Sequence, residues 1–282
     1  MQRFAVLQLT GCAGCEVSLL NAEEWVDQHE LVYMPLVTSA YSIPEVDLLL
    51  VTGSVQTDED LYKLRNAVRR ANRVVAVGTC AISGGVLNLG DREETGELFL
   101  AEESRRDLPR LLPRCRPIDT VVSVDQYLPG CPPTPELFMA LLFDPPDFKI
   151  AKTVCQECGR KKDKKMRPTH LLGFQHGMVL PDICLVNQGY LCIGTSTRGG
   201  CRALCTRAGQ PCVGCRGPSD LFIEKGSKKW FATIQRVFSK MTDIPVHEIE
   251  AALRSPQLSL FLSQFSHYAH KEPHPKLKAK VL

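Results

Sequence analysis

Residues 4–16 read FAVLQLTGCAGCE, an apolar run that leads directly into a turn of glycine and cysteine. The run Phe4–Leu9 has the character of a buried strand, and the residues near Glu16–Gln28 have that of a helix. The same order of apolar run, turn and amphipathic segment returns several times in the first half of the chain. Strands that alternate with helices indicate a parallel sheet covered on both faces.

The first half of the chain carries a full set of such elements. Leu61, Leu64 and Val68 share one face of a predicted helix, and Thr134 with Pro135 marks the start of another. We expect further strands at 31–37, 47–55, 73–77 and 120–124, and helices at 58–71 and 135–143. The pattern predicts an α/β fold, a flavodoxin-like doubly wound parallel sheet domain over residues 1–150.

The composition changes after Pro145 and Pro146. Strand-like runs become rare, cysteine and glycine become frequent, and residues 159–168 form the basic stretch GRKKDKKMRP. We expect residues 151–282 to form an irregular, cysteine-rich domain held together by metal sites, with helices at 227–240 and 245–254. The basic stretch either attracts an acidic electron-transfer partner or is simply a solvated loop.

The overall composition limits the function classes. The chain is 44% hydrophobic and 23% charged, as in globular proteins, and its net charge of +3 gives little support to nucleic-acid binding. No apolar run approaches the roughly 18 residues that indicate a membrane span. The start of the sequence shows no export signal, so we expect a cytoplasmic location. In that reducing compartment, dense cysteine indicates metal or redox chemistry rather than disulfides.

The chain has thirteen cysteines, and six of them form C-x-x-C pairs. Thiolates are soft ligands, and two of them three residues apart can bind one metal centre without strain. Twelve of the thirteen sort into three groups of four, which predicts three four-thiolate sites. Cys115, between Pro113 and Pro117, is left over and is interpreted as a structural or surface thiol.

The first group lies at strand ends. Cys12 and Cys15 follow the first predicted strand, Cys80 the fourth and Cys131 the fifth. Ligands bind beyond the carboxyl ends of parallel strands, and the glycines in GCAGC, GTCA and PGCPP leave room for a bulky inorganic group. The alternative for each lone cysteine is a small buried apolar residue.

Three acidic residues near this edge have two interpretations each. Glu16 either hydrogen-bonds to another chain or interacts with the dipole of its helix. Asp58 and Glu59 either approach the rim of the site or belong to an ordinary helix start, in which Asp58 is the N-cap.

The other eight thiols lie between residues 155 and 215 and predict two further sites. They are Cys155, Cys158, Cys184, Cys192, Cys201, Cys205, Cys212 and Cys215. Paired C-x-x-C motifs also build zinc ribbons, so a zinc-stabilised interaction module is an alternative. The run from Cys192 is denser than such ribbons usually are.

These motifs resemble those of one family. GCAGCE at 11–16, VGTCAISGG at 77–85 and PGCPPTPE at 129–136 resemble the small subunit of [NiFe] hydrogenases. CIGTSTRGGCRALC and PCVGCRGP resemble the cluster domain of the cytoplasmic group 3 members, of the methyl-viologen-reducing, deazaflavin-non-reducing or sulfhydrogenase-like type. The small subunit of respiratory complex I is similar in fold but has adjacent cysteines in place of CAGC and lacks the eight-cysteine domain.

The resemblance implies three [4Fe-4S] clusters and no catalytic residue in this chain. It implies a proximal cluster on Cys12, Cys15, Cys80 and Cys131. It implies a distal cluster on Cys155, Cys158, Cys184 and Cys192. It implies a medial cluster on Cys201, Cys205, Cys212 and Cys215. Cys192 and Cys201 are close enough to exchange roles in this partition.

Two departures from periplasmic relatives concern cluster type. Cys155 stands where those proteins have a histidine, and Cys205 supplies a fourth medial thiol. Both favour a [4Fe-4S] over a [3Fe-4S] medial cluster. By the resemblance, the chain relays single electrons between the NiFe site of a large subunit and a further flavin or iron-sulfur subunit near the distal cluster. The alternative is a cluster-bearing subunit of a complex-I-like oxidoreductase.

Overall fold

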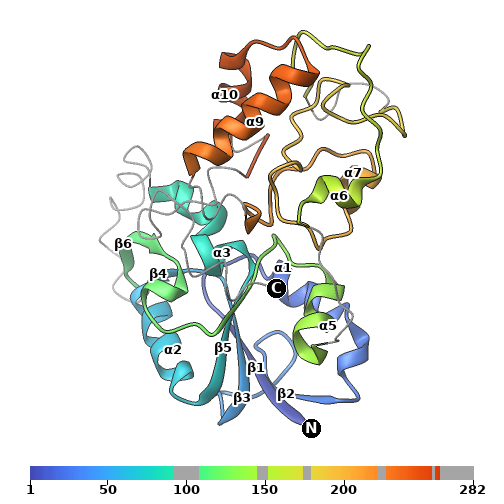
Figure 1. Ribbon diagram of the computed structural model, residues 1–282. Coiled ribbons are helices and arrows are strands. Elements are labelled where there is room, and N and C mark those ends of the chain that lie inside the picture. The colour runs from blue at the N-terminus through green and yellow to red at the C-terminus, as the bar shows by residue number, and fades with distance from the viewer. Residues whose placement is uncertain (92–107, 145–151, 174–178, 221–226, 256–257, 261–282) are drawn as a thin grey trace. The chain divides into compact units, whose positions relative to one another are not determined.

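The computed structural model describes residues 1–91, 108–144, 152–173, 179–220, 227–255 and 258–260 (Figure 1). The chain divides into two compact units, whose main segments are Met1–Pro146 and Asp147–Leu262. The boundary predicted near Pro145 and Pro146 lies outside the described residues.

The first unit is built on a parallel sheet. Its strands within the described residues are β1 (Gln2–Gln8), β2 (His29–Tyr33), β3 (Val46–Thr52), β5 (Ala71–Val77) and β7 (Gln126–Leu128). They lie in the order β2-β1-β3-β5-β7, and every neighbouring pair is parallel. Counted along the chain this order is 2-1-3-4-5, which is the flavodoxin-like order. The predicted fold class is confirmed.

Helices cover both faces of this sheet. They are α1 (Gly14–Leu20), α2 (Asp58–Val68), α3 (Gly78–Ser83) and α5 (Pro135–Phe143), with the 3-10 turns η1 (Glu23–Trp25), η2 (Gly85–Asp91) and η3 (Ile118–Thr120). Figure 1 shows α2 on one side of the sheet and α1 with α5 on the other. Leu49, Leu50 and Val75 of the central strands are completely buried, as expected for a sheet covered twice.

The strand predicted at 47–55 ends earlier than expected. Gly53, at φ 75°, turns the chain after β3, and Val55–Thr57 forms the short strand β4. β4 pairs antiparallel with β6 (Leu111–Arg116), a strand that the sequence reasoning missed. Pro113 made β6 hard to predict, because proline is excluded from central strands but tolerated at sheet edges.

The strand predicted at 120–124 is wrong. Thr120 is the last residue of η3, and a turn follows it. Thr120 Oγ1 donates to the Pro117 carbonyl at 2.7 Å, and the Val121 and Val122 N–H groups both donate to the Ile118 carbonyl. These local bonds outweigh the β-branched composition of the segment. The last strand is β7, a few residues further on.

Two predicted helices are shorter than expected. The segment at 16–28 forms α1 only to Leu20 and continues as η1. The helix predicted at 58–71 ends at Val68, because Ala71 already belongs to β5.

The second unit is mostly irregular in its described part. It contains α6 (Val154–Cys158), α7 (Leu204–Arg207), α9 (Ser227–Met241) and α10 (Val246–Arg254). The isolated bridges Lys161↔Ile183, Leu172↔Tyr190 and Thr197↔Pro218 connect its loops. The two long helices share a core of fully buried side chains, namely Trp230, Ile234, Phe238, Ile249 and Leu253. Among the described helices, none is long and apolar enough to span a membrane.

Candidate metal centres

The fold gathers the first four predicted ligands at the carboxyl edge of the sheet. Cys12 and Cys15 lie at the turn from β1 into α1, Cys80 lies in α3 after β5, and Cys131 follows β7. Burial raises the pKa of the Cys15 thiol well above its usual value, and the negative charges of Glu16, Cys80, Cys131 and Cys12 raise it further. Four thiols from three separate turns therefore lie close to one another at this edge.

The other members of this first set confirm their mutual proximity. The pKa of Cys80 is raised to about 12 by burial and by the thiolates of Cys131, Cys12 and Cys115. Burial also raises the pKa of Cys131, with Cys12 adding to the effect. A bound cationic centre removes this penalty, because a metal ion deprotonates its thiol ligands outright. The donor set thus fits a thiolate-bound metal group.

Glycine is required beside two of these sulfurs. Gly78 has φ 82°, and a Cβ on it would lie 2.5 Å from Cys15 Sγ. Gly85 has φ 59°, and its Cβ would lie 2.8 Å from Cys80 Sγ. Any side chain there would both strain the backbone and push the thiol away.

Polar side chains hold the cysteine turns together. The N–H and Oγ1 of Thr79 both donate to the Gly130 carbonyl, at 2.8 and 3.0 Å, which joins the Cys80 and Cys131 turns. Ser18 Oγ of α1 donates to the Pro133 carbonyl at 2.5 Å. These bonds connect all three cysteine-bearing turns within one hydrogen-bonded frame.

The acidic residues near the site differ from expectation. Asp58 is not the N-cap of α2; the cap is Thr57, and Asp60 completes a capping box with it. Asp58 Oδ1 instead accepts from the Arg110 N–H at 3.0 Å. Asp60 was missed, although the spacing T-x-x-D indicates such a box. Glu59 pairs with Lys63 on the exposed surface of α2.

Glu16 is enclosed within this chain. It is 2% exposed in the first turn of α1, and its carboxylate accepts a hydrogen bond from Thr52 Oγ1 at the end of β3. The bond ties α1 to the sheet beside Cys15.

Cys115 is a buried thiol. Its sulfur donates to Ser54 Oγ at 3.2 Å and lies 3.8 Å from the Gly84 carbonyl, while its N–H donates to Asp91 Oδ1. At 2% exposure the surface interpretation is wrong and the structural one holds.

The second unit brings four more predicted ligands together around α6. Partial burial of its thiol raises the pKa of Cys155 to about 12, and the negative charges of Cys192, Cys184 and Cys158 raise it further. Burial raises the pKa of Cys192 to about 11, and the thiolates of Cys184 and Cys158 again act in the same direction. Taken over backbone and side chain together, Cys155 is exposed to solvent, so this set reaches the surface of the unit.

The last four cysteines lie in two pairs beside a buried arginine. Burial raises the pKa of Cys201, with Cys205 contributing, and that of Cys212, with Cys192 and Cys215 contributing. Arg216 is 2% exposed and lies near Cys215, Cys201 and Glu157; burial and Arg198 lower its pKa to about 10. The Cys212 N–H also donates to Cys192 Sγ at 3.3 Å, which connects this set with the previous one.

A site for a single metal ion needs a different arrangement of ligands from a site for a cluster. In the described part of the chain, no three His, Cys, Asp or Glu side chains are arranged to hold one metal ion.

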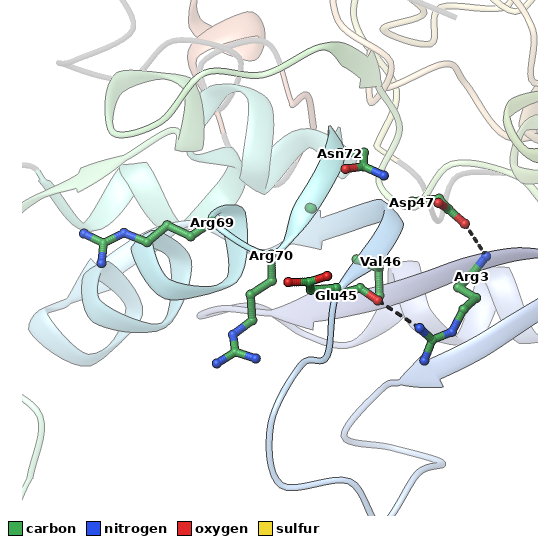
Figure 2. A pocket seen from close by; sticks show the side chains of 8 residues that line it. Arg3, Glu45, Val46, Asp47, Arg69, Arg70 and Asn72 are labelled. Atoms are coloured by element: carbon green, nitrogen blue, oxygen red, sulfur yellow. Dashed lines mark hydrogen bonds between the residues drawn. The ribbon is translucent and has the colours of Figure 1, made fainter.

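A polar hollow of about 410 Å³ lies at the opposite edge of the sheet, where β1, β3 and β5 begin. Figure 2 shows the Arg3 side chain turned toward the backbone of this edge, with Arg69 and Arg70 extending away from it. Arg3 donates from its N–H to Asp47 Oδ2 at 2.9 Å and from Nη1 to the Glu45 carbonyl at 3.2 Å. These bonds hold the beginnings of β1 and β3 together. The candidate metal ligands of this unit lie at the other edge of the sheet, where the strands end.

Known proteins match this chain over most of its length. The family profile described as NADH ubiquinone oxidoreductase, 20 Kd subunit, matches residues 12–144. A relative from the F420-non-reducing hydrogenase vhu of Methanocaldococcus jannaschii is 32% identical over 284 residues, which cover 94% of each chain. The delta subunit of sulfhydrogenase 2 of Pyrococcus furiosus is 32% identical over 266 residues, covering 90% of this chain and 98% of that protein.

A solved structure supports the fold. The actinobacterial-type NiFe-hydrogenase of Ralstonia eutropha H16 aligns with a TM-score of 0.51 and 16% identity, covering 91% of this chain and 87% of the matched one. The near full-length sequence matches carry the family assignment, since each exceeds 30% identity. This chain belongs to the hydrogenase subunit family of those relatives and is a small subunit of a group 3 [NiFe] hydrogenase.

Proposed function

We propose that this chain carries single electrons through three [4Fe-4S] clusters, between the NiFe site of a large-subunit partner and a further electron-transfer subunit. The observation that carries the proposal is the convergence of Cys12, Cys15, Cys80 and Cys131 at the carboxyl edge of the sheet, on turns that the Thr79 and Ser18 hydrogen bonds hold together. Thiolate-bound clusters exchange one electron at a time at potentials set by charge, hydrogen bonds and exposure.

We assign the proximal cluster to Cys12, Cys15, Cys80 and Cys131. Glycine beside two of these sulfurs keeps the backbone close to them without displacing them. The bonds from Thr79 and Ser18 fix the turns in place, so the thiols are positioned before any cluster binds.

We assign the distal cluster to Cys155, Cys158, Cys184 and Cys192. The partition follows chain order and is supported by Cys155 and Cys192, since the charges of both Cys184 and Cys158 act on each of these two thiols. The medial cluster then falls to Cys201, Cys205, Cys212 and Cys215. The bond from the Cys212 N–H to Cys192 Sγ would connect these two clusters. We place the chain in the cytoplasm, whose reducing conditions suit a chain with thirteen cysteines.

A second candidate is a cluster-bearing subunit of a complex-I-like oxidoreductase. It is favoured by the family profile, whose description names NADH ubiquinone oxidoreductase. That match ends at residue 144, however, whereas the hydrogenase relatives also match the second unit. The nickel content of the complex separates the two functions.

The test is a metal analysis of the complex isolated anaerobically from its native source. Three four-iron clusters predict about twelve irons on this chain. One nickel per complex, with iron beyond that number, supports the hydrogenase relay. Iron without nickel supports the complex-I-like alternative, and zinc with little iron overturns both.

A matched pair of variants tests the ligand assignment. Cys80→Ala should lose about four irons and all dye reduction, whereas Cys115→Ala should keep the full iron content. Wild-type turnover by the Cys80→Ala complex would contradict the proximal assignment.

A further inference from the structure

Four exposed lysines lie in one short loop of the second unit. Lys161, Lys162, Lys164 and Lys165 are all exposed, and we call this set the lysine loop. The loop interrupts an otherwise cysteine-rich unit and has no part in the ligand sets described above.

The backbone of the lysine loop is held firmly. The Lys161 N–H donates to the Asp182 carbonyl at 2.8 Å, and the Lys161 carbonyl accepts from the Cys184 N–H at 2.7 Å. Buried Asn187 accepts from the Asp163 N–H and donates to the carbonyls of Asp163 and Met166, at 3.1, 2.8 and 2.9 Å. The lysines thus project from a fixed base.

The neighbouring arginines bond to groups within the unit, whereas the four lysine side chains are exposed to solvent. Arg160 donates to three carbonyls, and Arg167 pairs with Asp243 at 2.7 Å. Among the described residues, none of the four lysines forms an ion pair. Two carboxylates belong to the same hydrogen-bonded framework, namely Asp163, whose Oδ1 accepts from the Lys165 N–H, and Asp182, which is exposed. The four lysines outnumber these two carboxylates.

The lysine loop borders the second thiol set. Lys161 is bonded directly to the backbone of Cys184, as described above. The positive charge of Lys162 acts on the thiol of Cys155, which is exposed as a residue. The positive surface therefore lies where this set reaches solvent, which is where an electron would leave or enter.

We propose that the lysine loop is the docking surface for an acidic, one-electron carrier protein that exchanges electrons at the Cys155 set. The inference rests on the proposed function and adds the chemistry of the partner surface. Clustered charge of one sign raises the association rate of an oppositely charged protein and aligns it, and the effect weakens as salt rises. The net charge of the whole chain is only +3, so the overall charge contributes little to this attraction and the local cluster matters more.

The experiment uses the complex of this chain with its large subunit and two electron acceptors. A plant-type [2Fe-2S] ferredoxin serves as the acidic protein, and benzyl viologen serves as a small cationic dye. The variant carries Lys161→Gln, Lys162→Gln, Lys164→Gln and Lys165→Gln. At low salt its kcat/KM for ferredoxin should fall about tenfold, and the salt dependence should flatten. The viologen rate should stay at the wild-type value.

A matched control removes four positive charges elsewhere. Lys63, Arg65, Arg69 and Arg70 are exposed on and just after α2, and their change to Gln should leave both rates unchanged. Equal losses in the two variants would overturn the proposal, as would a wild-type complex that reduces viologen but not ferredoxin. If the lysine variant lost binding to a short DNA duplex but kept the wild-type rate of ferredoxin reduction, the lysine loop would be a general polyanion site. That result would also overturn the proposal. Absence of viologen reduction in the wild type would instead refute the electron relay itself.

Discussion

The hydroxyl of Thr10 donates a 2.7 Å hydrogen bond to Oδ2 of Asp60. Thr10 follows β1 and leads into the Cys12 turn, while Asp60 lies in the first turn of α2. Asp60 also accepts from the backbone N–H groups of Thr10, Gln56 and Thr57 and from Thr57 Oγ1. One buried carboxylate thus caps a helix and fixes the chain that enters the first thiol set.

Asp60→Ala should therefore weaken the first unit. The change leaves several buried donors without an acceptor, at a cost of about 3 kcal/mol. The measurement is native-state amide exchange in β1 and β3, where the local opening free energy should fall by that amount. Glu59→Ala is the control, since its exposed pair with Lys63 contributes little. Equal exchange in the two variants would refute the role of Asp60.

Gly78→Ala should disrupt the first thiol set without a change in any sulfur. The added Cβ would meet Cys15 Sγ at 2.5 Å on a backbone with φ 82°. The complex should lose about four irons, measured by metal analysis and by the loss of one reduced-cluster EPR signal. Gly90→Ala is the matched control, because its Cβ would meet nothing within 4 Å. Full iron content in Gly78→Ala would show that the site tolerates the displacement.

The sequence predicted those features that depend on neighbouring residues. Apolar runs such as Phe4–Leu9 and the glycine-cysteine turns that follow them identify strand ends, and the order of elements then determines the edge at which the thiols gather. It failed where a distant partner decides the outcome. Leu111–Arg116 becomes a strand only because β4 lies beside it.

Local bonds account for the other failures. At 120–124 the turn bonds to Pro117 and Ile118 prevail over strand propensity. The capping role of Asp60 could be predicted from the T-x-x-D spacing, yet its bonds to Thr10 span fifty positions and no local pattern predicts them.

His29 should make stability depend on pH. It is 9% exposed, its ring lies edge-on to Phe143 at 4.9 Å, and burial with the positive N-terminus lowers its pKa. An unfolded histidine titrates near about 6.5. Below that pH the unfolded chain binds a proton that the folded chain resists, so stability falls as pH drops from 6.5 toward the folded pKa. Melting temperatures of the complex should show this slope.

The variant His29→Phe isolates this contribution. Its melting temperature should fall less than that of the wild type below pH 6.5, because the titrating group is gone. His247→Gln, exposed on α10, should keep the wild-type slope. Identical slopes in wild type and His29→Phe would show that other groups control the acid response.

Arg216 should set the potential of the cluster assigned to Cys201, Cys205, Cys212 and Cys215. Its guanidinium is buried near Cys215 and Cys201, and a cluster gains one negative charge on reduction. A buried cation stabilises the reduced form, so Arg216→Gln should lower one midpoint potential by about 60 mV, a tenfold change in equilibrium constant. Redox titration followed by EPR measures this midpoint potential.

Two further variants serve as controls. Arg216→Lys should restore most of the potential, and Arg236→Gln, exposed on α9, should leave every midpoint potential unchanged. Unshifted potentials in Arg216→Gln, with iron content intact, would exclude this electrostatic role and leave Arg216 as a packing residue.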